Sequence, residues 1–311
     1  MTAAEKRTTL RDLPREALAQ RLARGLRLHV GPFVVCFTAR DPVLAACLAA
    51  HYPDYPLAPD DSFADARIAL RDQGRWARWR GHPRVISLED DGNFARFPAE
   101  QLLAQIEWGL NWCIAMRANQ YLMLHGGVVA REEGAMILPG LPGAGKSTLT
   151  AYLMHRGWRL FSDEFTLLAP DSRMLQPFPR LIPLKNESID VIAREVPEAR
   201  FGPRIPNTRK GLVAHLCPGA EHLRRMHESA GPRLIVFPRY VAGAQTELST
   251  VPAAEAFAEL TNNAFNYVLL GAQGFELVAD LVDATRCYRL RYSDLADANA
   301  HLTALMRAMA D

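Results

Sequence analysis

A glycine-rich loop between an apolar run and a helix-forming run constrains the fold of this chain most. Residues 140–148, GLPGAGKST, satisfy G-x-x-x-x-G-K-S/T. The apolar run AMILP before the loop predicts a strand, and TLTAYLMHR after it predicts a helix. Backbone N–H groups of such a loop curl around a phosphate at the helix N-terminus, where unpaired donors and the helix dipole favour an anion. The sequence therefore predicts an α/β domain that holds a nucleoside triphosphate.

Each residue of this loop has an expected role. Lys146 is expected to reach the β and γ phosphates, and the Ser147 hydroxyl to ligate Mg²⁺. The expected cofactors are ATP or GTP, together with Mg²⁺. The expected nucleotide-binding residues are Gly140, Leu141, Pro142, Gly143, Ala144, Gly145, Lys146, Ser147 and Thr148.

An acidic pair follows soon after the loop. Gly157 predicts a helix C-cap, and WRLFS after it predicts a strand that ends at Asp163 and Glu164. We expect this strand to lie beside the phosphate-loop strand. Asp163 comes only 17 residues after Lys146, whereas switch GTPases and motor ATPases usually place their magnesium-supporting acid much later. The spacing argues against those classes, and two simply solvated acids are the alternative.

A histidine interrupts an apolar strand upstream of the loop. His125 lies in YLMLHGGVVA, 15 residues before Gly140. A single histidine in such a strand is more often a packed core residue. Here the strand is expected to form a hairpin with AMILPG, so His125 could lie near the phosphates and the Asp163 carboxylate. A His–Asp contact there would tune a general base.

Composition limits the classes of partner. The chain is 49% hydrophobic and 23% charged, which is typical of a globular protein, and its net charge of +2 calls for neither nucleic acid nor an anionic membrane. Its five cysteines form no CxxC pair, as expected in a reducing cytosol. The N-terminus has no apolar leader, and no apolar run reaches membrane-spanning length. We expect a cytoplasmic protein.

Patterns along the chain predict two domains. Residues 11–30 predict an amphipathic helix, 32–38 a strand, and 52–65 a proline-rich loop. The short runs IALRDQ, WARWRG and PRVISLEDDG predict a small antiparallel sheet. Helical spacing begins near Pro98. We therefore expect an N-terminal α+β module at 1–98 and a catalytic domain at 99–311.

Three motifs together resemble the HPr serine kinase/phosphorylase catalytic domain: HGGVV, GLPGAGKST and RGWRLFSDE. The chain is similar more specifically to the HprK-related kinase A subfamily, through a resemblance that covers most of residues 60–300. Its further segments are IEWGLNWCIA, LIPLKNESID, NTRKGLVAHL, FPRY, NAFNY and CYRLRYSDL. The resemblance implies an α/β (α+β) protein with a P-loop HPr kinase/PEP-carboxykinase-like C-terminal domain and a smaller N-terminal α+β domain.

The resemblance also implies residue roles. Lys146 and Ser147 would hold nucleotide and Mg²⁺, and His125 and Asp163 would form the proton-handling pair. Glu164 stands where the family has a second aspartate, and either acid could be the base or a metal ligand. The expected metal ligands are Ser147, Glu164 and Glu187, the last lying close to a distal magnesium-binding glutamate of the family.

One further residue completes the expected catalytic set of His125, Lys146, Asp163 and Arg209. Arg209, followed by Lys210 in NTRKG, is a candidate for a basic loop that neutralises the transferring phosphoryl group. A solvated basic turn is the alternative for this segment.

The implied reaction is transfer of the γ-phosphate to a serine hydroxyl of a small protein or peptide. One alternative is a kinase that acts on a small-molecule hydroxyl or carboxylate, and another is a nucleotide-binding regulatory module without transfer activity. The family's glycine-rich phosphorylase signature has no clear counterpart, and residues 1–98 do not match its regulatory domain. Because HPr kinases are hexamers, a homo-oligomer is expected.

Overall fold

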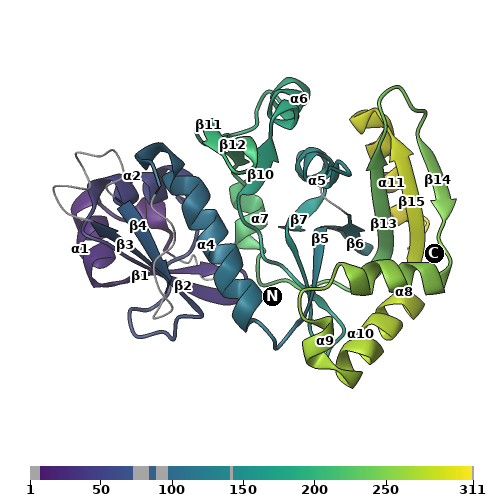
Figure 1. Ribbon diagram of the computed structural model, residues 1–311, viewed down its shortest axis with the longest axis horizontal. Helices are drawn as coiled ribbons and strands as arrows, with labels where there is room; N and C mark the ends of the chain where they lie inside the picture. The colour runs from purple at the N-terminus through teal and green to yellow at the C-terminus, as the bar shows by residue number, and fades with distance from the viewer. Residues whose placement is uncertain (1–7, 73–83, 89–96, 141–142, 310–311) are drawn as a thin grey trace. The chain divides into compact units, whose positions relative to one another are not determined.

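The computed structural model describes residues 8–72, 84–88, 97–140 and 143–309. It divides the chain into two compact units (Figure 1). The first unit comprises Met1–Arg117 together with Gly202–His215, and the second comprises Ala118–Phe201 together with Leu216–Asp311. Both units mix helices and strands, so the expected α/β (α+β) class is confirmed at that level. Among the described residues, no helix is both long and apolar enough to cross a membrane.

The first unit is built on a four-stranded sheet in the order β1-β2-β3-β4. β1 and β2 form an antiparallel hairpin, β2 and β3 are parallel, and β3 and β4 are antiparallel. The expected antiparallel sheet is therefore only partly correct, and the run WARWRG lies outside the described residues. The elements of this part are η1 (Leu10–Asp12), α1 (Arg15–Arg24), β1 (Leu26–Val30), β2 (Phe33–Thr38), α2 (Pro42–His51), β3 (Ala66–Asp72) and β4 (Arg84–Leu88).

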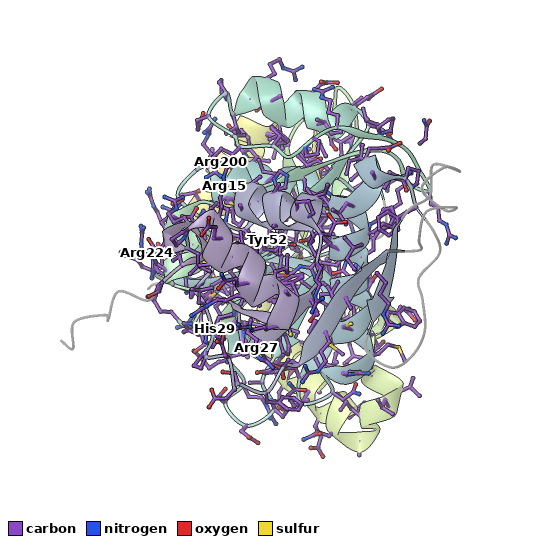
Figure 2. The ribbon with its side chains drawn as sticks, turned by 90° about the vertical axis from the view of Figure 1, so that its left-hand side faces the viewer. Arg15, Arg27, His29, Tyr52, Arg200 and Arg224 are labelled. Atoms are coloured by element: carbon purple, nitrogen blue, oxygen red, sulfur yellow. The ribbon has the colours of Figure 1, made fainter. Side chains whose placement is uncertain are left out.

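The helix expected over residues 11–30 is shorter, and a strand follows it. Gly25 adopts a positive φ of 113° and ends α1, as a left-handed C-cap does. In β1, buried apolar residues then alternate with half-buried Arg27 and His29, which are labelled in Figure 2. A period of two suits a strand, whereas the arginines alone suggested a helical polar face.

The first unit also includes helix α4 (Leu102–Arg117), which packs against β3. Within this unit, the Tyr52 hydroxyl donates a hydrogen bond to the Glu107 carboxylate of α4, and both residues are buried. The 3₁₀ helix η2 (Ala99–Gln101) precedes α4, and the Gln101 side chain donates to the Asn207 carbonyl at 3.3 Å. The unit therefore ends after Arg117, not at the expected 98/99 boundary.

The hairpin of β11 (Ile205–Thr208) and β12 (Gly211–Leu216) lies in a segment that the expected catalytic domain included. In the structure, Gly202–His215 belongs to the first unit instead. The chain thus leaves the second unit after Phe201 and returns to it at Leu216.

The second unit is built on a mixed sheet in the order β14-β15-β13-β6-β5-β8-β9, with β7 also paired to β5. β6, β13 and β15 run parallel, and β5 runs antiparallel to β6, so the expected hairpin is confirmed. The strands are β5 (Leu122–Arg131), β6 (Gly134–Pro139), β7 (Arg159–Ser162), β8 (Phe165–Leu168), β9 (Leu175–Gln176), β13 (Pro232–Tyr240), β14 (Glu247–Thr250) and β15 (Arg286–Tyr292).

Helices cover both faces of this sheet. Val128 and Ile137 belong to the core that includes residues of α8 and α10, which Figure 1 shows together. The preceding Gly127 and following Leu138 pair with each other and face α5 instead. The remaining elements are α5 (Lys146–Met154), β10 (Ile182–Lys185), α6 (Glu187–Glu195), α7 (Ala220–Arg224), α8 (Ala253–Asn262), α9 (Tyr267–Leu270), α10 (Ala272–Asp283) and α11 (Leu295–Arg307).

Candidate active site

The glycine-rich loop connects β6 to α5, as its sequence predicts. β6 ends at Pro139, and α5 begins at Lys146 directly after Gly145. Gly143 and Gly145 have positive φ values of 90° and 87°, a backbone conformation that favours glycine. Leu141 and Pro142 lie outside the described residues. The described part of the loop therefore ends at a helix N-terminus with unpaired N–H groups, which is a site for an anion.

Two tyrosines that the sequence analysis did not single out support this loop. The Tyr292 hydroxyl donates to the Gly145 carbonyl at 3.2 Å, and the Tyr240 backbone N–H donates to the Ala144 carbonyl at 3.1 Å. A Cβ atom added to Gly145 would lie 2.5 Å from the Tyr292 hydroxyl oxygen. These contacts come from strand ends about 100 or more residues later in the chain, so no local pattern indicates them.

The two glycines of HGGVV allow close packing on opposite faces of β5. A Cβ atom at Gly127 would lie 2.6 Å from Thr150 Oγ1 and 3.7 Å from Lys146 Cγ, both of α5. A Cβ atom at Gly126 would lie 3.0 Å from Thr166 Oγ1 of β8. Gly127 thus allows α5 to lie close to the strand that carries His125.

His125 lies beside the loop lysine. Gly126 pairs with Pro139 across the β5–β6 hairpin, so His125 is one position beyond the last paired residue of β6. Its Nε2 atom is 3.1 Å from Lys146 Nζ. The Phe265 ring meets the imidazole edge to face, with 5.8 Å between the ring centroids. The expected proximity of His125 to the phosphate loop is therefore present in the fold.

The acidic pair follows β7, a strand that pairs with β5. β7 pairs with β5 and not with β6, so the expectation that β7 lies directly beside the phosphate-loop strand is wrong. After β7, the Ser162 hydroxyl accepts hydrogen bonds from the backbone N–H groups of Glu164 and Phe165, at 3.3 and 3.0 Å. This turn places both acids at the end of the strand near the loop.

Asp163 is the most unusual charged group of this site. Its side chain is only 6% exposed, and neither carboxylate oxygen has a hydrogen-bond partner among the described residues. Burial raises the pKa of Asp163, and nearby Lys146 opposes that shift. The Ser147 hydroxyl is close enough to lower the same pKa, without forming a hydrogen bond of normal geometry. Such a buried carboxylate is costly unless it serves a ligand.

The second acid, not the first, faces the histidine. His125 Nδ1 is 3.8 Å from Glu164 Oε1, and the Glu164 carbonyl accepts the Gly126 N–H at 3.3 Å. The predicted His125–Asp163 contact is therefore replaced by a His125–Glu164 contact. Neighbouring side chains in an extended segment point in different directions, so only one of the two acids meets the imidazole.

A small hollow lies beside the acids, with room for about one water molecule. Phe165 and Phe178 form part of its apolar wall, and Asp163 lines it. The complete lining is Ser162, Asp163, Glu164, Phe165, Phe178, Arg180, Leu181 and Pro183. The hollow therefore marks the side from which a small polar group can approach the buried carboxylate.

The remaining predicted site residues lie in different places. Glu187 is exposed at the first position of α6. The positive charge of Lys185, two residues earlier, adds to that of Lys146 in lowering the pKa of Asp163. Lys185 lies in the segment LIPLKNESID, but no local pattern indicated its role. Arg209 is exposed at the turn between β11 and β12, in the first unit. The fold thus brings together Lys146, Ser147, His125, Asp163 and Glu164.

The donor set fits magnesium bound jointly with a nucleotide. Among the described residues, no three or more His, Cys, Asp or Glu side chains cluster closely enough for a metal site made by the protein alone. Magnesium does not need such a cage, because it is usually held by one or two carboxylates, phosphate oxygens and water. The unpartnered Asp163 oxygens beside the Ser147 hydroxyl match this chemistry.

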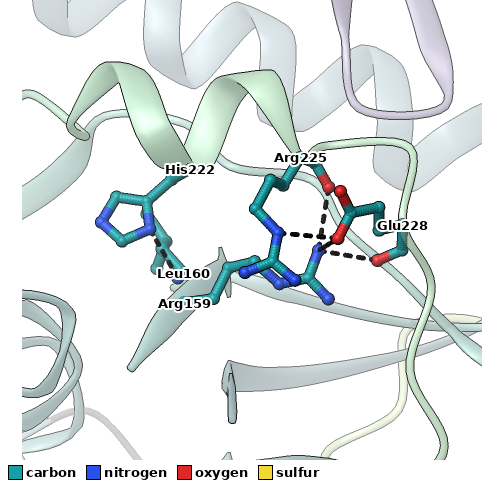
Figure 3. Close-up of polar contacts among 5 residues, drawn as sticks. All are labelled: Arg159, Leu160, His222, Arg225 and Glu228. Atoms are coloured by element: carbon teal, nitrogen blue, oxygen red, sulfur yellow. Dashed lines mark hydrogen bonds and ion pairs between the residues drawn. The ribbon is translucent and has the colours of Figure 1, made fainter. Parts of the chain in front are cut away.

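A polar cluster anchors β7, the strand that precedes the acids (Figure 3). His222 Nδ1 accepts the backbone N–H of Leu160 at 3.2 Å, and burial lowers the pKa of His222 to about 4. Arg159 donates to the carbonyls of Arg225 and Glu228 at 2.9 and 2.8 Å. The cluster connects β7 to the α7 segment and so holds the acid-bearing strand in place.

Comparison with known proteins assigns no family to this arrangement. No protein-family model matches the chain, and no curated protein sequence matches it either. Inferences about function therefore depend on the geometry of the site.

Proposed function

We propose that this protein is a kinase that transfers the γ-phosphate of ATP or GTP to a hydroxyl group. The observation that carries the proposal is Asp163, a buried carboxylate without a hydrogen-bond partner beside the lysine of a phosphate-binding loop. A buried carboxylate at this position is suited to accept the proton of an acceptor hydroxyl. The resemblance to the HPr serine kinase catalytic domain supports the same reaction, and the relation to that fold is part of the proposal.

Phosphoryl transfer requires mainly positioning and neutralisation of charge. The N–H groups at the start of α5 and the Lys146 ammonium would bind the β and γ phosphates. His125 Nε2, at 3.1 Å, accepts a hydrogen bond from Lys146 Nζ, which leaves the proton of the neutral imidazole on Nδ1, the atom facing Glu164. This chain of contacts would orient the lysine toward the phosphates.

Magnesium would be held by the Ser147 hydroxyl, the Glu164 carboxylate and phosphate oxygens, and it would offset negative charge on the phosphates. Asp163 would accept the proton of the acceptor hydroxyl. Burial raises its pKa toward the working pH, which suits a general base.

The acceptor proposed first is a serine hydroxyl of a small protein or peptide, because the resemblance implies it. A small molecule with a hydroxyl or carboxylate group is the alternative acceptor. A regulatory nucleotide-binding module, the second alternative, would use Asp163 only to support the magnesium ion and not as a base.

The test is phosphoryl transfer by matched variants Asp163→Asn and Glu164→Gln. The wild type is incubated with γ-labelled ATP or GTP and lysate of the source organism, and mass spectrometry identifies the labelled protein, peptide or metabolite. We expect Asp163→Asn to lower transfer by roughly 10²- to 10⁴-fold while nucleotide affinity changes little. Glu164→Gln should have the smaller effect. Undiminished transfer by Asp163→Asn would exclude the general-base role, and hydrolysis without any labelled acceptor would favour the regulatory module.

A further inference from the structure

The order of the strands defines which way a nucleotide bound at this loop would extend. β6 leads into the loop, with β5 on one side of it and β13 on the other. Lys146, His125 and the acids lie on the β5 side, so the γ-phosphate belongs there. The nucleoside end of the same molecule must leave the loop in another direction. On the other side of β6, the carboxyl end of β13 adjoins the loop.

An exposed aromatic residue, Tyr240, lies at the carboxyl end of β13. Tyr240 is the last residue of β13, and its side chain is 52% exposed. Because β6 and β13 are parallel, their carboxyl ends lie at the same edge of the sheet, where the phosphate loop begins. The Tyr240 N–H donates to the Ala144 carbonyl at 3.1 Å, so the residue is connected directly to the loop.

The Tyr240 ring packs against the buried ring of Tyr292. Tyr292, the partner of Tyr240 in the β13–β15 register, meets it edge to face with 5.9 Å between ring centroids. Tyr292 is 1% exposed, and its hydroxyl is bonded to the Gly145 carbonyl at 3.2 Å. An exposed ring supported in this way loses little conformational freedom when a flat ligand stacks on it.

We propose that Tyr240 is the stacking platform for the purine base of the nucleotide. The assignment rests on the proposed function, since it presupposes nucleotide binding at the loop. Stacking uses the face of a base and does not read its hydrogen-bonding edge. ATP and GTP therefore bind with similar affinity at this site, within a few-fold of each other.

The experiment separates the base from the phosphates. Binding of a non-hydrolysable ATP analogue and of inorganic tripolyphosphate, each with Mg²⁺, is measured by calorimetry on the full chain. Tyr240→Ala is expected to weaken binding of the analogue by roughly 5- to 100-fold, the range of base–aromatic stacking. Binding of tripolyphosphate, which has no base, should be unchanged. Tyr240→Phe, which keeps the ring, should bind both ligands like the wild type.

Two controls make the result specific. Phe275→Ala removes another exposed ring of the second unit, 56% exposed on α10, and should change neither affinity. Lys146→Ala should weaken both ligands. If Tyr240→Ala weakens binding of both ligands equally, Tyr240 only supports the loop and the proposal is overturned. Unchanged binding of both ligands by Tyr240→Ala would also overturn it. Failure of the wild type to bind either ligand would instead overturn the proposed function, and this assignment with it.

Discussion

Asp163 is a residue whose charge is expected to lower the stability of the ligand-free protein. A carboxylate that is 6% exposed and has no hydrogen-bond partner among the described residues destabilises the folded chain when it is ionised. Lys146 offsets part of that penalty, and Lys185 a smaller part. A bound nucleotide with its cation would offset more of it. Groups of this kind concentrate at functional sites, where stability is given up for reactivity.

We predict that Asp163→Asn stabilises the ligand-free protein at neutral pH, by on the order of 1–2 kcal/mol in the free energy of unfolding. The raised folded-state pKa means that wild-type stability is fully present below the ordinary aspartate pKa of about 4 and is lost as pH rises through the folded-state value. Asparagine does not titrate, so the advantage of the variant should grow with pH across that window. Urea denaturation at several pH values measures it.

Glu164→Gln is the matched comparison, because this neighbouring carboxylate is partly exposed. Its free energy of unfolding should differ from that of the wild type by less, with a weaker pH dependence. An Asp163→Asn variant less stable than the wild type at pH 7–8 would show that the carboxylate is paired in the folded state, contrary to its environment in this structure.

At the scale of elements, the packing of α5 on β5 decides where the phosphate loop lies relative to His125. Gly127 leaves no room for a Cβ atom, since Thr150 Oγ1 would be only 2.6 Å away. Thr150 is fully buried, and its hydroxyl has no hydrogen-bond partner among the described residues. The helix is thus held by close backbone approach and not by a side-chain bond at this point.

Gly127→Ala is expected to destabilise the protein by about 1–3 kcal/mol and to weaken nucleotide binding, because the new methyl group pushes α5 away from β5. Thermal denaturation and nucleotide titration measure the two effects. Thr150→Ala removes the clashing atom, so the double variant should recover most of the loss. Gly231→Ala is the control, since the nearest atom to its Cβ would be Met174 Sδ at 3.9 Å. An additive double variant would contradict the steric explanation.

At the scale of the whole molecule, two segments far apart in sequence complete the first unit. Helix α4 and the Gly202–His215 segment belong to the same unit as the N-terminal sheet, whereas Lys146, His125 and the two acids belong to the second unit. The buried contact between Tyr52 and Glu107 connects α4 to the N-terminal part. Stability and nucleotide binding should therefore be separable by mutation.

Tyr52→Phe is predicted to lower the free energy of unfolding of the first unit by about 1–3 kcal/mol, because the buried Glu107 carboxylate loses a hydrogen-bond donor. Nucleotide affinity, which depends on the second unit, should stay the same. Calorimetric unfolding and nucleotide titration of the same preparation test both statements. A parallel loss of affinity would show that the two units are energetically coupled.

Several features of this protein follow from local sequence. The strand–loop–helix at Gly140–Thr148, the β5–β6 hairpin and the acids at the end of β7 were all predicted, because neighbouring residues form them. The hairpin also brought His125 beside Lys146, since the turn sets the register of the two strands. The prediction of one helix over residues 11–30 was wrong for β1 (Leu26–Val30), because its arginine suggested a helical polar face and not the alternation of a strand.

The sequence by itself thus determined a glycine-rich loop between a strand and a helix, with a histidine and two acids nearby. Only the tertiary structure decided which acid faces His125, and that β5 separates β7 from β6. It also decided that Tyr240 and Tyr292 support the loop and that the first unit extends to Arg117. The physical reason is that these contacts join segments distant in sequence. Their pairing depends on burial and register over a whole unit, which no local pattern encodes.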